Sequence, residues 1–397
     1  MSQYAQFSVS TLSDSNDRVA VLNRRFINYL ISLNFARGQL LAEEGDEQVE
    51  VSASRELLAV EQQRRAEQAR RQAAHDRVRH EVEQQLHQRL YAAVEQRLNE
   101  PHFVRDRVLC LNANAAHLLD HLFSPSSSSR KIETLAQGLD WLHVGLVKLV
   151  NLPPFASPND LRRARITHFR NALNFVGSDD LKVIVGALSM QQWLPPAEAP
   201  FVLLRRKLWH HVMSTAVLCQ RLAELDDKLD PAVAFNIGMF HEMGKVVLAR
   251  LYVKIFDDVR QAMLQDLRNE TTSARYNALV NIDPDQQFLR DLMLQKDTQV
   301  TQHLFADFGL ARLPFTAVYE QYAQAHSVRE TSGYARVLWQ ANTFSEFRML
   351  HQANLATLDD GKLMFAASEI PAATVVELRK LNLKKLILAR ERASLAS

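Results

Sequence analysis

Two histidines and a glutamate near the middle of the chain have the types and the spacing of metal ligands. His211 lies in one helical pattern, and His241 and Glu242 close the next one, beyond the polar turn at residues 226–231. Two imidazole nitrogens and a carboxylate oxygen suit a hard-to-borderline divalent metal ion. Such an ion would activate a water molecule for phosphoester hydrolysis. These three residues are therefore the candidate site of the chain.

The remaining ligands of a complete hydrolytic site are harder to find. Such a site usually takes another carboxylate from a distant helix, but the polar residue on the apolar side of the helical pattern at 330–349 is Asn342, a neutral amide. Lys245 follows Gly244, yet no glycine-rich turn precedes the pair, so it is a poor phosphate-binding loop. Asn342 and Lys245 are therefore weak candidates for contact with a ligand.

The two neighbouring candidates at the end of the second helical pattern pose a geometric problem. Adjacent residues of a helix point about 100° apart, so His241 and Glu242 can face one point only if the helix bends or a side chain reaches far. Gly244 tolerates conformations that other residues avoid. We expect Gly244 to supply the bend and the helix to end or tighten there.

Helices must position these side chains. The chain has 397 residues, an apolar fraction of 47% and only 11 glycines. Its abundant Ala, Leu, Gln, Arg and Glu favour helices. Apolar residues recur at intervals of three and four, and no segment shows the sustained alternation of a strand. We therefore expect an all-α fold, with helices at residues 18–41, 54–99, 104–122, 132–137, 142–152, 160–176, 181–193, 201–225, 231–251, 253–269, 284–294, 297–308, 313–325, 330–349 and 372–392.

The expected helix at 54–99 has an unusual composition. Between Glu61 and Arg77 its only apolar side chains are alanines, so this part has little to bury. One interpretation is a long solvated helix that braces the next domain. The other is an arm for dimerisation or for docking a partner.

Charge, cysteines and apolar runs limit the class of protein. The formal net charge is +2, so we expect no nucleic-acid partner. Cys110 and Cys219 lie far apart and form no disulfide framework, which is typical of a reducing compartment. The N-terminus lacks the basic and apolar regions of a signal peptide, and the apolar runs are too short to span a bilayer. We expect a cytoplasmic protein without a membrane span.

The residues around the candidate site resemble the HDOD family, the HD-related output domains, which are degenerate relatives of the HD-type metal phosphohydrolases. The specific part is Trp209-x-His211 followed by AFNIGMFHEMGK at 234–245. Weaker similarities follow in the family's order at residues 146–151, 172–177, 181–189, 300–310 and 336–342. The resemblance implies an all-α domain in two subregions.

The resemblance also implies a division of the chain. An N-terminal helical extension, partly a long charged helix, would cover residues 1–104. The HDOD-like domain would cover 105–350, with an N-terminal helical subregion at 105–195 and an HD-like subregion at 200–350. A C-terminal helical tail would follow at 351–397.

Carried over residue by residue, the resemblance matches His211 to the first HD histidine and His241 to the second. Glu242 stands where HD enzymes have Asp, Asn342 stands where they have their last Asp, and Asp297 falls where many HDOD chains carry a histidine. The glycine-tyrosine-proline motif of the related cyclic di-GMP phosphodiesterases is absent. These departures weigh against catalysis, so we assign no catalytic residue.

Several functions agree with this resemblance. The first is a bacterial signal-transduction protein whose non-catalytic HDOD domain regulates or scaffolds protein partners of a signalling pathway. In that case the three candidate residues form a buried, hydrogen-bonded cluster, with or without a divalent metal ion. The alternative is a metal phosphohydrolase acting on a nucleotide or cyclic dinucleotide, with one ion held by His211, His241 and Glu242. A third possibility is a homo-oligomeric scaffold formed through the N-terminal helices.

Overall fold

The computed structural model describes residues 14–44, 59–100, 102–152, 155, 165–197, 200–267, 273–386 and 388, and the structural statements below concern these residues. Every regular element among them is a helix, which confirms the all-α fold. None of the described helices has the combination of length and apolar character that crossing a bilayer requires.

The elements follow one another without a repeat. In chain order they are α1 (Asp14–Ile31), α2 (Leu33–Glu44), α3 (Ala59–Asn99), the π-helical η1 (Val104–Val108), α4 (Ala113–Leu122), α5 (Ser129–Leu135), α6 (Asp140–Val150), α7 (Phe169–Val176), α8 (Ser178–Trp193), α9 (Leu204–Glu224), α10 (Pro231–Phe240), α11 (Met243–Leu267), α12 (Ser273–Val280), α13 (Gln286–Phe308), α14 (Phe315–Gln324), the 3₁₀-helical η2 (Val328–Glu330), α15 (Gly333–Gln352), α16 (Leu358–Ala367) and α17 (Ala372–Arg379).

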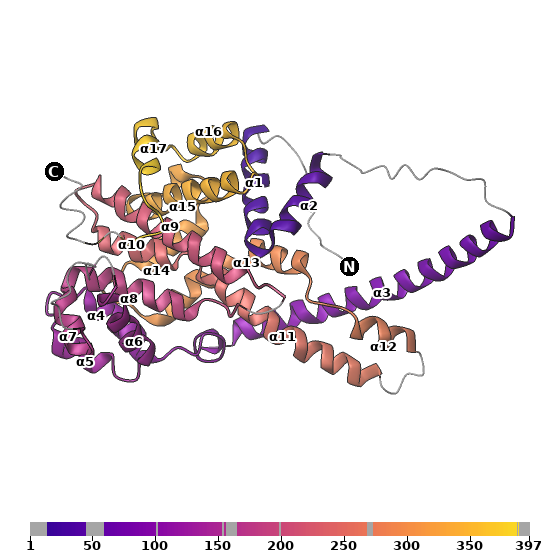
Figure 1. The fold of residues 1–397 in the computed structure, drawn as a ribbon, viewed down its shortest axis with the longest axis horizontal. Coiled ribbons are helices and arrows are strands. Elements are labelled where there is room, and N and C mark those ends of the chain that lie inside the picture. Colours follow the sequence, from indigo (N-terminus) through magenta and orange to yellow (C-terminus); the bar gives the residue numbers. More distant parts are fainter. Residues whose placement is uncertain are drawn as a thin grey trace.

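The helices form two groups joined along α8 and α10. Figure 1 shows α4 to α8 gathered at one end, with α9, α10 and α13 to α15 in the middle of the molecule. Helix α10 packs against α8 on one side and against α9 and α15 on the other. It begins at Pro231 and is capped by Asp230, whose carboxylate accepts from the backbone N–H groups of Ala232 and Val233. Because Gly238 has no side chain, α10 approaches α9 closely: a Cβ there would lie 2.8 Å from the Cα of Ala216.

The N-terminal helix α1 packs on the central helices rather than standing apart. Its apolar positions include Leu22, Phe26 and Leu30, which are almost completely buried, and α1 contacts α9, α13, α15 and α16. The buried guanidinium of Arg25 donates to the carbonyl oxygen of Leu355 at 2.9 Å. The pattern of three and four residues that predicted this helix thus also determined the face that it buries.

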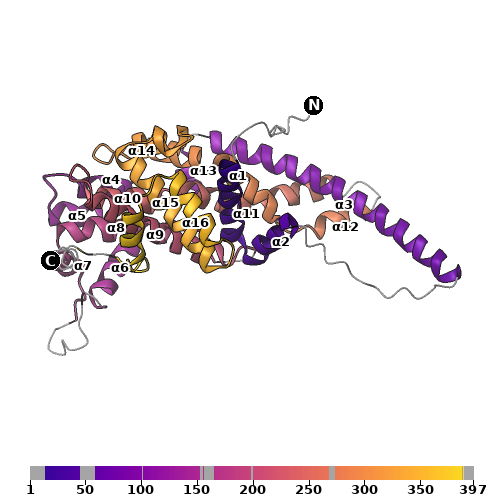
Figure 2. The ribbon, with the colours of Figure 1, turned by 90° about the horizontal axis from the view of Figure 1, so that it is seen from above.

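Helix α3 has two halves of different character. Residues 63–77, where alanines are the only apolar side chains, are exposed on every side. Farther along, Val82, Leu86, Leu90 and Val94 are buried, where α3 packs on α11 and α12. Figure 2 shows the exposed half extending beyond the body of the molecule.

Several expected helix boundaries were wrong, because single-turn breaks and continuous helices give similar patterns. The helix expected at 18–41 is interrupted at Ser32, and the one at 104–122 begins as a π-helical turn. Residues expected to form two helices at 284–308 form one, α13, and α12 and α16 were not predicted. The last expected helix ends at Arg379; its continuation past residue 388 lies outside the described residues.

Gly244 provides a test of the packing between α11 and α13. A Cβ at Gly244 would lie 1.8 Å from the carbonyl oxygen of Asp297, which is backbone and cannot rotate away. We expect Gly244→Ala to lower the free energy of unfolding by about 2–3 kcal/mol or more, as overpacking does, in urea denaturation. The control is Gly38→Ala in α2, where nothing lies within 4 Å. This control should be neutral or stabilise by up to about 1 kcal/mol, and equal midpoints for both variants would contradict the close approach.

Candidate functional site

A two-residue break between helices brings the candidate ligands together. His211 lies in the middle of α9, and His241 and Glu242 form the break between α10, which ends at Phe240, and α11, which begins at Met243. The prediction that Gly244 supplies the bend was wrong: Gly244 lies inside α11 and does not adopt a positive φ. It serves close packing, because a Cβ there would lie 1.8 Å from the carbonyl oxygen of Asp297 in α13; its N–H donates to Thr301 Oγ1 at 2.8 Å.

The three predicted metal ligands converge on one point. The Nε2 atoms of His211 and His241 are 3.2 Å apart. Glu242 Oε1 lies 3.3 Å from each of these two nitrogens. Asn342 also reaches the group, since its Oδ1 lies 3.1 Å from His241 Nε2. The structure therefore assembles residues from α9, the 241–242 break and α15 that are up to 131 positions apart, from His211 to Asn342.

Lys245 is the counter-ion of this group. Its Nζ lies 2.6 Å from Glu242 Oε2 and 2.5 Å from Asp297 Oδ2. Burial alone would lower the pKa of Lys245, but the carboxylates of Asp297 and Glu242 raise it above its ordinary value, so the amine stays charged. Asp297, which stands where many HDOD chains carry a histidine, thus belongs to the ion pairs of the site.

The same ion pair determines the charge of Glu242. Burial alone would raise its pKa, but above all the ammonium of Lys245 holds it well below the ordinary 4.5. Glu242 is therefore an ionised carboxylate whose one oxygen faces Lys245 and whose other oxygen faces the two imidazoles. A single buried negative charge is available to a metal ion at this point.

The hydrogen-bond partners of the two Nδ1 atoms indicate where the imidazole protons of His241 and His211 lie. His241 Nδ1 lies 2.7 Å from the carbonyl oxygen of Gly238; a carbonyl only accepts, so Nδ1 carries the proton and Nε2 presents its lone pair. Burial lowers the pKa of His211 from 6.5 to about 4, so this ring is neutral too. Its Nδ1 lies 3.0 Å from Ser345 Oγ, a hydroxyl that serves either neutral tautomer.

The donor set fits one divalent metal ion. With the His211 proton on Nδ1, lone pairs of His211, His241 and Glu242 all face one another, and no donor remains among them. Their separations of 3.2 and 3.3 Å are those expected of ligands that share an ion with bonds of about 2.0–2.2 Å. Asn342 Oδ1 is a further, neutral oxygen. Such an ion would supply Lewis-acid polarisation of a bound oxygen. With the His211 proton on Nε2, this N–H is instead a donor to the neighbouring acceptors, His241 Nε2 and Glu242 Oε1.

The site is closed to large molecules. The exposed fractions are 0% for His211, 2% for Glu242 and 8% for His241. The ring of Phe26 lies on His211, with 4.7 Å between the ring centroids. The second oxygen of Glu242 is held by Lys245. A phosphoester therefore has no open path to the ligand atoms in this conformation.

Sequence reasoning missed Glu346, which extends the cluster along α15. Asn342 Nδ2 donates to Glu346 Oε1 and to Tyr322 Oη, each at 3.1 Å. Burial raises the pKa of Glu346 from 4.5 to about 8, so it is mostly protonated at neutral pH. Its position four residues after Asn342 was the available signal, because that spacing puts both on one face of a helix. Ser345 and Phe26 gave no comparable signal.

Glu346 should make stability depend on pH. Its folded pKa lies above the unfolded value, so between pH 4.5 and about 8 the folded protein keeps a proton that the unfolded chain has released. Stability from this group is therefore lost as pH rises through that window. We expect Glu346→Gln, which stays neutral, to gain roughly 2–4 kcal/mol over the wild type between about pH 5 and pH 9 in urea denaturation.

The control for this experiment is Asp227→Asn in the exposed turn after α9. Its difference from the wild type should not change with pH in the same window. A constant difference between Glu346→Gln and the wild type from pH 5 to pH 9 would contradict a buried, protonated Glu346.

Several solved structures are similar to this chain at low sequence identity. Solved structures similar to this chain include a provisionally named phosphohydrolase from Shewanella amazonensis SB2B, with 16% identity over 74% of this chain and 95% of that chain and a TM-score of 0.46. An HDOD domain protein with unknown function from Geobacter sulfurreducens has 15% identity over 72% of this chain and 97% of that chain, with a TM-score of 0.41. A provisionally named signal transduction protein from Marinobacter aquaeolei VT8 has 14% identity over 78% of this chain and 65% of that chain, with a TM-score of 0.45.

Likeness at this level carries no conclusion about activity, and no curated protein matches the sequence. The family model described as "HDOD domain" matches residues 110–279. This stretch contains His211, His241, Glu242 and Lys245, whereas Asn342 lies beyond it. The match shows an HDOD domain at residues 110–279 of this chain, which agrees with the motif at residues 234–245.

Proposed function

We propose that this chain is a signal-transduction regulator or scaffold whose HDOD domain does not catalyse hydrolysis. The observation that carries the proposal is the closed, charge-compensated state of the His211–His241–Glu242 cluster. A metal hydrolase needs an open coordination position and a route for its substrate. Here Phe26 lies on one histidine and Lys245 holds the carboxylate, which supports a structural and regulatory use of the cluster.

The cluster is well placed to couple several helices. His211 belongs to α9, Asn342 and Ser345 belong to α15, and Lys245 connects the start of α11 to Asp297 in α13. Moving one of these helices would break buried hydrogen bonds or ion pairs, which is costly. Such a network favours a small number of discrete arrangements, and a partner that binds one of them better shifts the balance.

We divide the chain as the family resemblance implies. Residues 1–104 are the N-terminal extension, 105–350 the HDOD-like domain with subregions at 105–195 and 200–350, and 351–397 the C-terminal tail. The exposed half of α3 offers a surface for a protein partner of the pathway or for a second copy of the chain. We place the protein in a bacterial cytoplasm.

A divalent-metal phosphohydrolase is the second candidate. It is favoured by the ligand atoms of His211, His241 and Glu242, which all lie within 4.8 Å of one another. Its substrate would be a nucleotide or a cyclic dinucleotide. This candidate requires α1 or α15 to move so that the cluster opens, whereas the regulatory proposal requires no opening.

Metal content and turnover distinguish the two candidates. Full-length protein is purified, its Mn, Fe, Zn and Ni are measured by mass spectrometry, and hydrolysis is assayed on nucleotides and cyclic dinucleotides with each ion added. We expect no turnover that depends on His241, because the closed cluster admits no phosphoester. A stoichiometric metal that His241→Ala abolishes, without turnover, identifies the ion as structural.

The matched control is His303→Ala, an exposed histidine of α13 outside the cluster. It should retain the metal content of the wild type. Hydrolysis that is lost in His241→Ala and kept in His303→Ala would overturn the non-catalytic proposal.

A further inference from the structure

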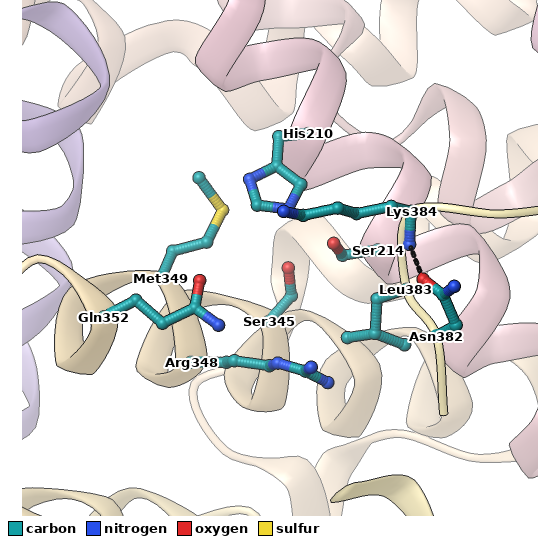
Figure 3. Close-up of a pocket in the computed structure, with 9 residues that line it drawn as sticks. All are labelled: His210, Ser214, Ser345, Arg348, Met349, Gln352, Asn382, Leu383 and Lys384. Carbon is teal, nitrogen blue, oxygen red and sulfur yellow. Dashed lines mark hydrogen bonds between the residues drawn. The ribbon is translucent and has the colours of Figure 1, made fainter. Parts of the chain in front are cut away.

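A second site lies behind His211, on the side of α15 that faces the C-terminal segment. A cavity of about 230 Å³ lies between α9 and α15, and residues 382–384 form part of its wall. His210 and Ser214 line it from one face of α9, and Ser345 and Arg348 line it from one face of α15. Figure 3 shows these side chains converging, with the Lys384 side chain extending across the cavity toward His210.

The cavity is positively charged. Arg348, Lys384 and His210 contribute basic groups, and none of the described residues that line it is acidic. The cations of Arg348 and Lys384 therefore have no compensating carboxylate in the cavity wall. An anion bound there would offset their charge.

The donors of the cavity match a phosphate group. The guanidinium of Arg348 is half-buried, and its hydrogen bond to the carbonyl oxygen of Leu381 is long, at 3.5 Å. Its planar fork suits two oxygens of one phosphate. The hydroxyls of Ser214 and Ser345, which are 3% and 1% exposed, line the floor. Lys384 adds a point charge from the opposite wall.

We propose that this cavity binds a compact small molecule that carries a phosphate group. Its 230 Å³ is below the roughly 300–1,000 Å³ of sites for drug-sized ligands, which favours a small phosphomonoester over a nucleotide. Its walls come from α9, α15 and the segment 382–384, and so narrow a space favours a free metabolite over a segment of another protein. The inference deepens the proposed regulatory function, on which its role in signalling rests, and it supplies the chemical class of the regulator.

Ser345 connects this cavity to the metal-ligand cluster. Its Oγ lies 3.0 Å from His211 Nδ1 and also lines the cavity. An anion that accepts the hydroxyl proton of Ser345 leaves the oxygen lone pairs to accept from His211 Nδ1–H. Occupancy of the cavity would thereby favour one tautomer of His211.

The test is calorimetric titration of the full-length protein with glycerol 3-phosphate and with inorganic phosphate. We expect saturable binding of glycerol 3-phosphate, none of glycerol, and weaker binding at high salt because the contact is ionic. Arg348→Gln and Lys384→Gln should each weaken binding at least tenfold. Lys228→Gln removes a lysine in an exposed turn away from the cavity and should bind as the wild type does. Inorganic phosphate shows whether the phosphate group alone suffices.

Two results would overturn the site: no saturable binding of either anion by the wild type, or unchanged affinity in both Arg348→Gln and Lys384→Gln. Lys384 is exposed, so its substitution tests the site even if Arg348→Gln unfolds. The calorimetric measurement reports binding and does not depend on turnover of a substrate. Hydrolysis dependent on His241 would overturn the non-catalytic function and leave this site intact, whereas loss of binding would remove this site alone.

Discussion

The buried ion pairs of Lys245 with Glu242 and Asp297 are the constraint on which the centre of this protein depends. A charge in an apolar interior is tolerated only when it is paired, and removing one partner typically costs roughly 3–5 kcal/mol. Lys245 joins the start of α11 to Asp297 on α13, and Gly244 lets the two helices meet backbone to backbone. The position of the 241–242 break, and thus of His241, follows from this contact.

The same pairing decides what the histidines can do. Burial keeps His211 neutral although the ionised Glu242 beside it favours the charged imidazole, and burial also keeps Glu346 largely protonated. In the metal-binding form the proton of His211 lies on Nδ1, and in the metal-free form it can lie on Nε2. A site of this kind is better suited to holding helices in a defined arrangement than to turning over a substrate. Phe26, from the N-terminal extension, covers it.

The cavity behind His211 gives this arrangement a route to respond to a small anion. It shares Ser345 with the cluster, and its basic groups come from α9, α15 and the C-terminal segment. Phe26 of α1 thus contacts His211 itself, and residues 382–384 line the cavity that shares Ser345 with the cluster. Both flanking segments contribute side chains to the chemistry at the centre.

The sequence by itself determined the helical class, most helix positions and the identity of His211, His241 and Glu242 as one group. Periodicity and residue type are local properties, and they can be recognised without knowledge of the fold. The sequence did not determine the helix boundaries, since a break such as 241–242 leaves the apolar pattern of the helices on both sides intact.

Only the tertiary structure decided how these residues are used. It made Lys245 a counter-ion through Asp297, protonated Glu346 by burial, and placed Phe26 over His211. Each of these effects depends on contacts between residues far apart in the chain, such as Phe26 and His211. The free energy of a buried charge or proton depends on its three-dimensional surroundings, and no local pattern in the sequence specifies them.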